Sequence, residues 1–452
     1  MKRLDWLVLP LLLAACTHVP HRDASHDEPE IPSDWRTQAG PQAPLAPDWW
    51  NGFGDPVLTR LVEAALANNL DVATAAARVR EARAQEDLAR SQQFPSLDFS
   101  NNTSRGRTFS PLGVPTIETT QQRVFQAAYE VDLFGRIAEQ VGAARAGTQA
   151  SEAARAAAAL SVAAATATGY ITLRSLDARL ALLEETVLAR REALRVANER
   201  ADVGYTSDLE RRQAEAEYES AAQQVPATRL LIERQEHALA LLTGTAPRDI
   251  VRGRPLTSLT LPPIPAGVPS DLLRRRPDIA QAEDTLVAAD ATLASTRAQF
   301  LPSLRLTASL GRLAVSPLDP ITVWSLGSSV LAPIFNGGRI QSQVDTAQAR
   351  REQAAYAYQR TVLTALREVE DNLSAVVRSR EQHAHLQAQR TALANALFHA
   401  GRRYRAGYSS YLEQLDAQRG VLAADLALIQ AATDELTALV ALSQAMGGGW
   451  TP

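Results

Sequence analysis

The chain has 452 residues, of which 46 are basic and 50 acidic, and its formal net charge is −4. So mildly acidic a chain offers no large basic surface, and we expect no nucleic acid partner. Lys2 is the only lysine, and HExxH, GxSxG and glycine-rich phosphate motifs are absent, which removes the usual signs of phosphate-loop, Schiff-base and hydrolytic enzymes. His383 and His385 are two apart on an expected helix and so point to different faces. We therefore expect neither an enzyme nor a metal site.

The amino terminus has the pattern of a secretory signal. Lys2 and Arg3 precede an apolar run over residues 6–15. The run is too short to cross a bilayer as a helix, but its length suits the apolar core of a signal peptide. We expect residues 1–15 to be removed on export.

The signal ends in the letters LAAC at residues 13–16. They resemble the cleavage box of bacterial lipoproteins, in which the cysteine is lipidated and becomes the first mature residue. Cys16 is the only cysteine, so the chain has no internal disulfide, and Thr17 in place of aspartate implies sorting to the outer membrane. We expect a covalent lipid on Cys16, no other cofactor, and a flexible tether over residues 16–31. An ordinary signal peptide with an incidental cysteine is the alternative.

Most of the remaining chain has the pattern of long amphipathic helices. We expect helices over residues 71–93, 137–203, 207–243, 277–299, 339–406 and 410–446. At about 1.5 Å of rise per residue each of the two longest would span roughly 100 Å, and the shorter ones stacked end to end nearly match that length. Leu173, Leu176 and Leu180 step by three and then four residues, which predicts coiled-coil packing. Pro226 predicts a kink in its helix.

Two segments, residues 96–134 and 303–335, change to a period of two. Phe125, Ala127 and Tyr129 alternate with Gln126, Ala128 and Glu130, which predicts strands with one apolar face. Each segment contains a cluster of turn residues near its middle, so each predicts a hairpin and the chain carries four strands. Little else in the sequence would cover the apolar face of these hairpins, and membrane lipid is the expected cover.

The chain contains an internal repeat. Residues 203–210, VGYTSDLE, return as residues 406–413, AGYSSYLE, a shift of 407 − 204 = 203. Gly204 and Gly407 suit the left-handed conformation that ends a helix. The spacing of Ser207 and Glu210, and of Ser410 and Glu413, is that of a capping box at the start of the next helix. Both copies are therefore predicted to be the tips of helical hairpins.

The repeat divides the chain into two parts after the tether. We assign residues 32–270 to the first repeat and residues 271–452 to the second. Proline and glycine interrupt the helical pattern at 32–56, at 245–270 and near the carboxyl end, so these segments would form a belt around the middle of the helices.

Four phrases together resemble a known family. They are WWNGFGDP at residues 49–56, YEVDLFGR at 129–136, RRPDI at 275–279 and PIFNGGR at 333–339. With them the chain, from Cys16 onward, resembles the TolC- and OprM-like outer-membrane factors of efflux and secretion systems, in particular the lipoprotein branch labelled NodT.

The resemblance implies a fold and an assembly. The fold is mainly α with a membrane β-barrel: a homotrimer whose chains each give four strands to one 12-stranded barrel, continued by a tunnel of antiparallel coiled-coil helices through the periplasm. It implies an outer-membrane channel of a tripartite efflux system, a passive exit duct for drugs and other small toxic compounds. Its expected partners are outer-membrane lipid, a periplasmic adaptor protein and an inner-membrane pump.

The resemblance also assigns roles to residues at the tips. Adaptor contact would fall on Gly204, Tyr205 and Ser207 in the first hairpin and on Gly407, Tyr408 and Ser410 in the second, although these residues would also serve simply to cap helices. Glu413 and Asp416 are three apart and share a helix face. They match acidic positions that line the periplasmic entrance, and a solvated helix face is the alternative.

Two other functions stay open from the sequence alone. A duct for protein secretion belongs to the same class of channel, because the pump selects the substrate. A non-conducting, lipid-anchored structural coiled coil belongs to another class, and the alternating strands argue against it.

Overall fold

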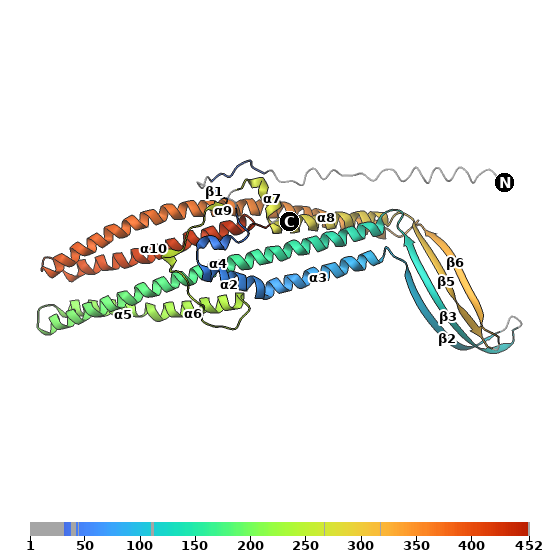
Figure 1. Ribbon diagram of the computed structural model, residues 1–452, viewed down its shortest axis with the longest axis horizontal. Helices are drawn as coiled ribbons and strands as arrows, with labels where there is room; N and C mark the ends of the chain where they lie inside the picture. Colours follow the sequence, from blue (N-terminus) through green and yellow to red (C-terminus); the bar gives the residue numbers. More distant parts are fainter. Residues whose placement is uncertain are drawn as a thin grey trace.

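The computed structural model describes residues 31–37, 42–43, 45–109, 113–265, 267–316 and 318–450. The expected signal peptide, Cys16 and nearly all of the expected tether lie outside these residues. Figure 1 shows an elongated molecule in which the helices run along most of the length and a sheet bends away at one end.

The helices of the described residues are α2 (Pro56–Asn68), α3 (Leu70–Ser91), α4 (Arg136–Asp202), α5 (Asp208–Ala222), α6 (Gln224–Leu242), α7 (Leu272–Arg275), α8 (Pro277–Ala298), α9 (Arg339–Arg405) and α10 (Tyr411–Ala445), with 3₁₀ turns η1 (Trp49–Phe53), η2 (Leu256–Ser258) and η3 (Pro269–Asp271). The strands are β1 (Gln42–Ala43), β2 (Ser96–Phe109), β3 (Pro115–Val131), β4 (Ile264–Pro265), β5 (Ser303–Val315) and β6 (Ile321–Leu331).

The internal repeat is visible in the two longest helices. Both α4 and α9 contain 67 residues. Each begins directly after a glycine in the left-handed region, Gly135 with φ of 75° and Gly338 with φ of 82°, and these positions differ by 338 − 135 = 203. A side chain at either position would be strained. The same strand-to-helix turn is therefore used twice.

The leucine seam expected on the first long helix packs against another helix. Leu173 and Leu183 are fully buried, and Leu173 lies in one apolar cluster with Ile232 and Leu239 of α6. Figure 1 shows α5 and α6 in line beside one half of α4, with α3 beside the other half. The expectation of coiled packing and of short helices stacked end to end is confirmed.

The expected kink near Pro226 is a break. Helix α5 ends at Ala222 and α6 begins at Gln224, with a turn at Gln223 between them. A proline has no N–H to donate to the carbonyl four residues earlier, here that of Ala222. The second hairpin has no such interruption, because α10 runs unbroken from Tyr411 to Ala445.

Four strands form one antiparallel sheet in the order β2-β3-β5-β6. The hairpin of each repeat therefore pairs with the other through β3 and β5, in a register that sets Phe125 opposite Leu310. Within the hairpins Phe99 lies opposite Phe125 and Leu310 opposite Trp324. The two edge strands, β2 and β6, have no strand partner on their outer sides among the described residues.

Three segments far apart in sequence meet around the middle of the helices, as expected. Strand β1 pairs in parallel with β4, and the indole of Trp35 donates to the carbonyl of Gly267 at 2.7 Å. Near the carboxyl end, a guanidinium nitrogen of Arg276 donates to the carbonyl of Ala445 at 2.9 Å. The largest cluster of buried apolar side chains also lies here and includes Phe53 and Leu58. Helix α2 was not expected from the sequence.

Candidate functional site

The two expected tips lie at the same end of the molecule. Figure 1 places the α4–α5 and α9–α10 connections together, opposite the sheet. Gly204 has φ of 72° and Gly407 φ of 78°, and the space where a Cβ would stand is open at both. The tyrosines beside them are the most exposed part, with 82% of Tyr205 and 80% of Tyr408 accessible. The two turns thus present aromatic rings outward from the end of the helical bundle.

The prediction of capping boxes at these turns is wrong, because the expected side-chain hydrogen bonds do not form. Ser207 and Ser410 do stand at the N-cap positions of α5 and α10, but neither side chain caps the helix. Glu210 instead accepts a short hydrogen bond from the hydroxyl of Tyr404, and Glu413 pairs with Arg403 at 3.2 Å. The glutamates hold neighbouring helices rather than their own first turn, because a guanidinium or a phenol offers a better donor than the distant backbone N–H.

A polar link joins the first hairpin to the second just above the tips. Tyr404 of α9 donates to Glu210 of α5, and its hydroxyl receives a guanidinium N–H of Arg200 of α4 at 3.1 Å. The same guanidinium lies 5.3 Å from the ring centroid. Burial, followed by the hydrogen bond to Glu210, raises the pKa of Tyr404 to about 12. Since the ordinary value is near 10, this link is intact below pH 10 and is lost as the pH rises toward 12.

A second polar link lies about two to three helical turns farther from the tips. Arg190 of α4 is 5% exposed, donates to Gln418 of α10 and lies 3.6 Å from Glu217 of α5. Glu217 also accepts from Arg419 of α10 at 2.9 Å. Between the two links Tyr411 and Leu415 are buried against α4 and α5. Apolar contact and charge-assisted hydrogen bonds together hold the hairpins to one another.

The expected gate carboxylates are both on the surface. Glu413 and Asp416 are exposed in the described chain and lie on one side of the first turns of α10. Glu413 is held by Arg403, and Asp416 acts on Arg419 by charge alone. These carboxylates are therefore available to line a surface that faces another part of an assembly.

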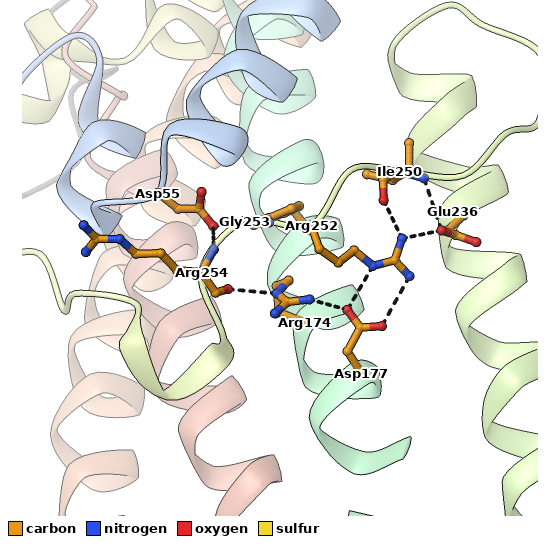
Figure 2. A network of polar contacts seen from close by, with 9 residues as sticks. Asp55, Arg174, Asp177, Glu236, Ile250, Arg252, Gly253 and Arg254 are labelled. Carbon is orange, nitrogen blue, oxygen red and sulfur yellow. Dashed lines mark hydrogen bonds and ion pairs between the residues drawn. The ribbon is translucent and has the colours of Figure 1, made fainter. Parts of the chain in front are cut away.

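A second cluster of polar contacts secures the belt to the long helix α4 (Figure 2). The carboxylate of Asp55, only 2% exposed, accepts from the hydroxyl of Tyr170 at 2.7 Å and from the N–H of Arg254 at 2.9 Å. The Tyr170 hydroxyl in turn accepts from the N–H of Gly253 at 2.9 Å. A Cβ on Gly253 would stand 2.2 Å from Asp55, so this close approach requires glycine.

The belt continues into a chain of ion pairs. Arg252 donates to both carboxylate oxygens of Asp177, at 3.0 and 3.2 Å, and also to Glu236 of α6. Arg174 links Asp177 to the carbonyl of Arg254, which it meets at 2.9 Å. Figure 2 shows these side chains forming a continuous chain of contacts from Arg254 to Glu236. Helices α4 and α6 are thereby joined through a loop that has no regular structure of its own.

Sequence reasoning missed these linking residues. The repeat does contain a signal for the link at the tips. Arg200 and Glu210 recur as Arg403 and Glu413 at the same shift of 203 residues. Position 404 carries tyrosine, whereas its counterpart at 201 is alanine. No cluster of three or more His, Cys, Asp or Glu that would suit a metal occurs in the part of the chain described by the structure.

The two faces of the sheet differ in polarity, and this difference indicates the environment of the sheet. One face has the row Phe99, Phe125, Leu310 and Trp324, and 75% of Trp324 is exposed. The opposite face has the row Asp98, Gln126, Ser309 and Ser325. A sheet with an exposed apolar face and a polar reverse face is typical of a transmembrane barrel, apolar toward lipid and polar toward the lumen.

Long helical hairpins joined to such a sheet define a class of protein, the outer-membrane channels with a periplasmic helical tunnel. The profile of the outer membrane efflux protein family matches residues 61–245 and 268–448. The chain belongs to this family.

Individual relatives are similar to this chain over nearly its whole length. The solvent efflux pump outer membrane protein SrpC of Pseudomonas putida is 36% identical, over 98% of this chain and 97% of its own length. The antibiotic efflux pump outer membrane protein ArpC of the same species is 33% identical, over 99% and 95%. The crystal structure of the CmeC outer membrane channel of Campylobacter jejuni superposes with a TM-score of 0.87 at 28% identity, covering 94% of each chain. This chain is thus an outer-membrane efflux channel.

Loss of the Tyr170 hydroxyl will weaken the belt. In Tyr170→Phe, both the buried Asp55 carboxylate and the N–H of Gly253 lose a partner, and each such loss costs about 1–3 kcal/mol. We expect a lower midpoint of thermal unfolding for the purified protein. Tyr218→Phe is the matched control, since the Tyr218 hydroxyl makes only a 3.4 Å contact with Arg191 at an exposed site. Equal midpoints for the two variants would contradict the role given to Asp55.

Proposed function

We propose that three copies of this chain assemble into one continuous duct, the passive exit path of a tripartite efflux pump. The observation that carries this is the four-stranded sheet with two open edges, β2 and β6, and an exposed apolar face. In lipid an unpaired strand edge leaves backbone groups without partners, at a cost of several kcal/mol each, so the sheet must close with other copies. Three such sheets make a barrel of the expected 12 strands.

The duct itself supplies no energy. The lumen would be lined by polar side chains such as Gln126 and Ser309, which are suited to an aqueous path. An inner-membrane pump, joined through a periplasmic adaptor, would drive transport and select the substrate. The relatives named for solvents and antibiotics support small toxic compounds as the cargo.

The helical end would act as the gate. In a ring of three chains, each α10 brings Glu413 and Asp416 toward the entrance, where like charges held near one another attract cations. Arg403 holds Glu413, while Tyr404 holds the first hairpin through Glu210. Release of these contacts would let the hairpins move apart and widen the entrance.

Conductance across a planar lipid bilayer tests the duct and the gate together. Purified wild-type protein should give discrete current steps. Glu413→Gln with Asp416→Asn, and separately Tyr404→Phe, should give steps at least about twice as large, because each change releases a contact that holds α10 or α9.

Asp319→Asn is the control for the loss of a carboxylate, because Asp319 lies between β5 and β6 at the far end of the molecule. Its steps should match those of the wild type. If verified insertion of the wild type gave no steps at all, the chain would be a structural coil and not a channel.

The exposed tip aromatics are the proposed contact for the adaptor. Small residues at Gly204, Ser207, Gly407 and Ser410 allow another helical hairpin to approach closely, and Tyr205 and Tyr408 give it an apolar surface. A turn needs no aromatic residue, which favours partner contact over capping alone.

Loss of both rings should therefore uncouple the channel from its pump. We expect Tyr205→Ala with Tyr408→Ala to abolish drug resistance in cells that carry the cognate pump and adaptor, while the current steps of the purified channel persist. Leu188→Ala, which removes an exposed apolar side chain of α4 about four turns before the tip, should leave resistance unchanged. Normal resistance in the double variant would exclude the tips as the essential contact.

The amino terminus is the remaining proposal. Cys16 would carry a covalent lipid that adds a second attachment to the membrane beside the barrel. The intact mass of the mature protein should correspond to a chain that begins at Cys16 and bears acyl groups, and Cys16→Ala should lack them. A mature chain that begins elsewhere, with an unmodified cysteine or none, would contradict lipidation.

A further inference from the structure

Four arginines lie on the apolar side of the sheet, beyond its aromatic row. Arg123 lies two residues before Phe125 on β3, and Arg312 two residues after Leu310 on β5. Alternate residues of a strand share a face, so both guanidinium groups lie on the side of Phe125 and Leu310. Arg105 and Arg107 of β2 are six and eight residues beyond Phe99 and lie on that side too.

The register brings two of these charges together. Arg123 and Arg312 are directly opposite one another on neighbouring strands, with Asn101 beyond Arg123 and Thr322 beyond Arg312. Like charges in directly opposed positions destabilise a sheet pair. An anion bound beside the pair would offset this repulsion.

No acidic side chain on this face of the described strands neutralises the group. Glu118 of β3 and Asp98 of β2 belong to the other face. Arg105, Arg107, Arg123 and Arg312 are all exposed, and none has an ion pair or side-chain hydrogen bond within the described residues. The result is an uncompensated cationic surface, here called the arginine face.

The position of the arginine face along the barrel follows from strand geometry. Exposed aromatic residues mark the junction of strands and helices, among them Phe134 and Phe335, the latter 91% exposed. From Val131, the last residue of β3, to Phe125 is 131 − 125 = 6 residues, or about 20 Å of strand. With a strand tilt of about 40°, this corresponds to roughly 15 Å along the membrane normal. The exposed turn residues Leu133 and Phe134 extend the apolar surface past the end of the strand, toward the ~25 Å apolar band of such barrels.

The arginine face therefore starts beyond the last apolar row that runs across all four strands. Arg123 and Arg312 lie one side-chain row beyond Phe125 and Leu310, about 5 Å farther along the membrane normal. The helices extend from the other end of the sheet (Figure 1), so the arginine face is on the outer-leaflet side, toward the lipid headgroups.

We propose that the arginine face binds phosphorylated headgroups of anionic lipid in the outer leaflet. A guanidinium group matches phosphate with two parallel hydrogen bonds and is less strongly hydrated than an ammonium group. The facing pair, Arg123 and Arg312, would hold one phosphate between them, and Arg105 and Arg107 would contact neighbouring headgroups. The inference rests on the barrel proposed above, and it adds a lipid requirement that the efflux function does not contain.

Binding of a defined lipid to the purified trimer tests the proposal. The probes are bis-phosphorylated lipid A, the same lipid after removal of its phosphates, and inorganic phosphate. We expect the wild-type protein to bind the phosphorylated lipid, with an affinity that falls as salt rises, and to bind the other two far more weakly. Similar affinity for the dephosphorylated lipid, or for inorganic phosphate, would overturn the proposal.

Charge variants identify the residues. Arg123→Gln with Arg312→Gln should weaken binding by about 30-fold, given about a fivefold effect per arginine near an anionic surface. Arg305→Gln is the matched control, because Arg305 is an exposed arginine of β5 on the opposite face. Equal losses in the control would overturn the assignment to the arginine face.

Two further measurements separate lipid binding from folding and from transport. Arg123→Lys with Arg312→Lys keeps the charge but loses the paired hydrogen bonds, so its affinity should lie between those of the wild type and of the glutamine variant. If the glutamine variant lost its trimer or its thermal stability in parallel with binding, the effect would come from strand packing. All variants should give the current steps of the wild type. If the wild type gives no steps, the proposed duct fails; if it gives steps but no selective lipid binding, only the lipid proposal fails.

Discussion

The structure depends on one constraint, the need of every backbone N–H and C=O inside lipid for a hydrogen-bond partner. Within one chain, the backbone groups are paired where β2 meets β3, β3 meets β5 and β5 meets β6. The outer edges of β2 and β6 can be paired only by further chains. The helical part obeys a different rule, because its backbone is paired within each helix and its side chains decide what packs against what. In both repeats the transition from strand to long helix occurs at a left-handed glycine, Gly135 or Gly338.

Much of this organisation follows from sequence patterns. The period of two in residues 96–134 and 303–335 predicts the four strands, and the leucine spacing near Leu173 predicts the packing of α4, because burial imposes these periods on the chain. The tips follow from a glycine that only a left-handed turn requires. Pro226 likewise predicts a distortion of its helix, since the missing N–H acts locally; the sequence predicts a kink, and the structure has a break between α5 and α6. Each of these signals is legible because its cause lies within a few residues.

The contacts that hold the hairpins and the belt were not predictable in the same way. Asp55 meets Tyr170 across 115 residues and Tyr404 meets Glu210 across 194, and no local pattern encodes such a meeting. The expected capping boxes show the reverse error, since the local spacing was correct but Glu210 and Glu413 had better partners in the folded chain. Helix α2 was not predicted, because it follows directly on a segment rich in proline and glycine, residues 32–56, that has no helical pattern.

The tyrosine at position 404 has a consequence for the symmetry of the assembled entrance. Two repeats in each of three chains would give a ring of six similar hairpins, joined at six seams. The counterpart of Tyr404 in the first repeat is Ala201, which has no hydroxyl with which to bridge to a neighbour. In such a ring, the seam within each chain would contain the Tyr404 bridge and the seam formed by Ala201 would lack it. The six hairpins would then move as three pairs, and the entrance would have threefold rather than sixfold symmetry.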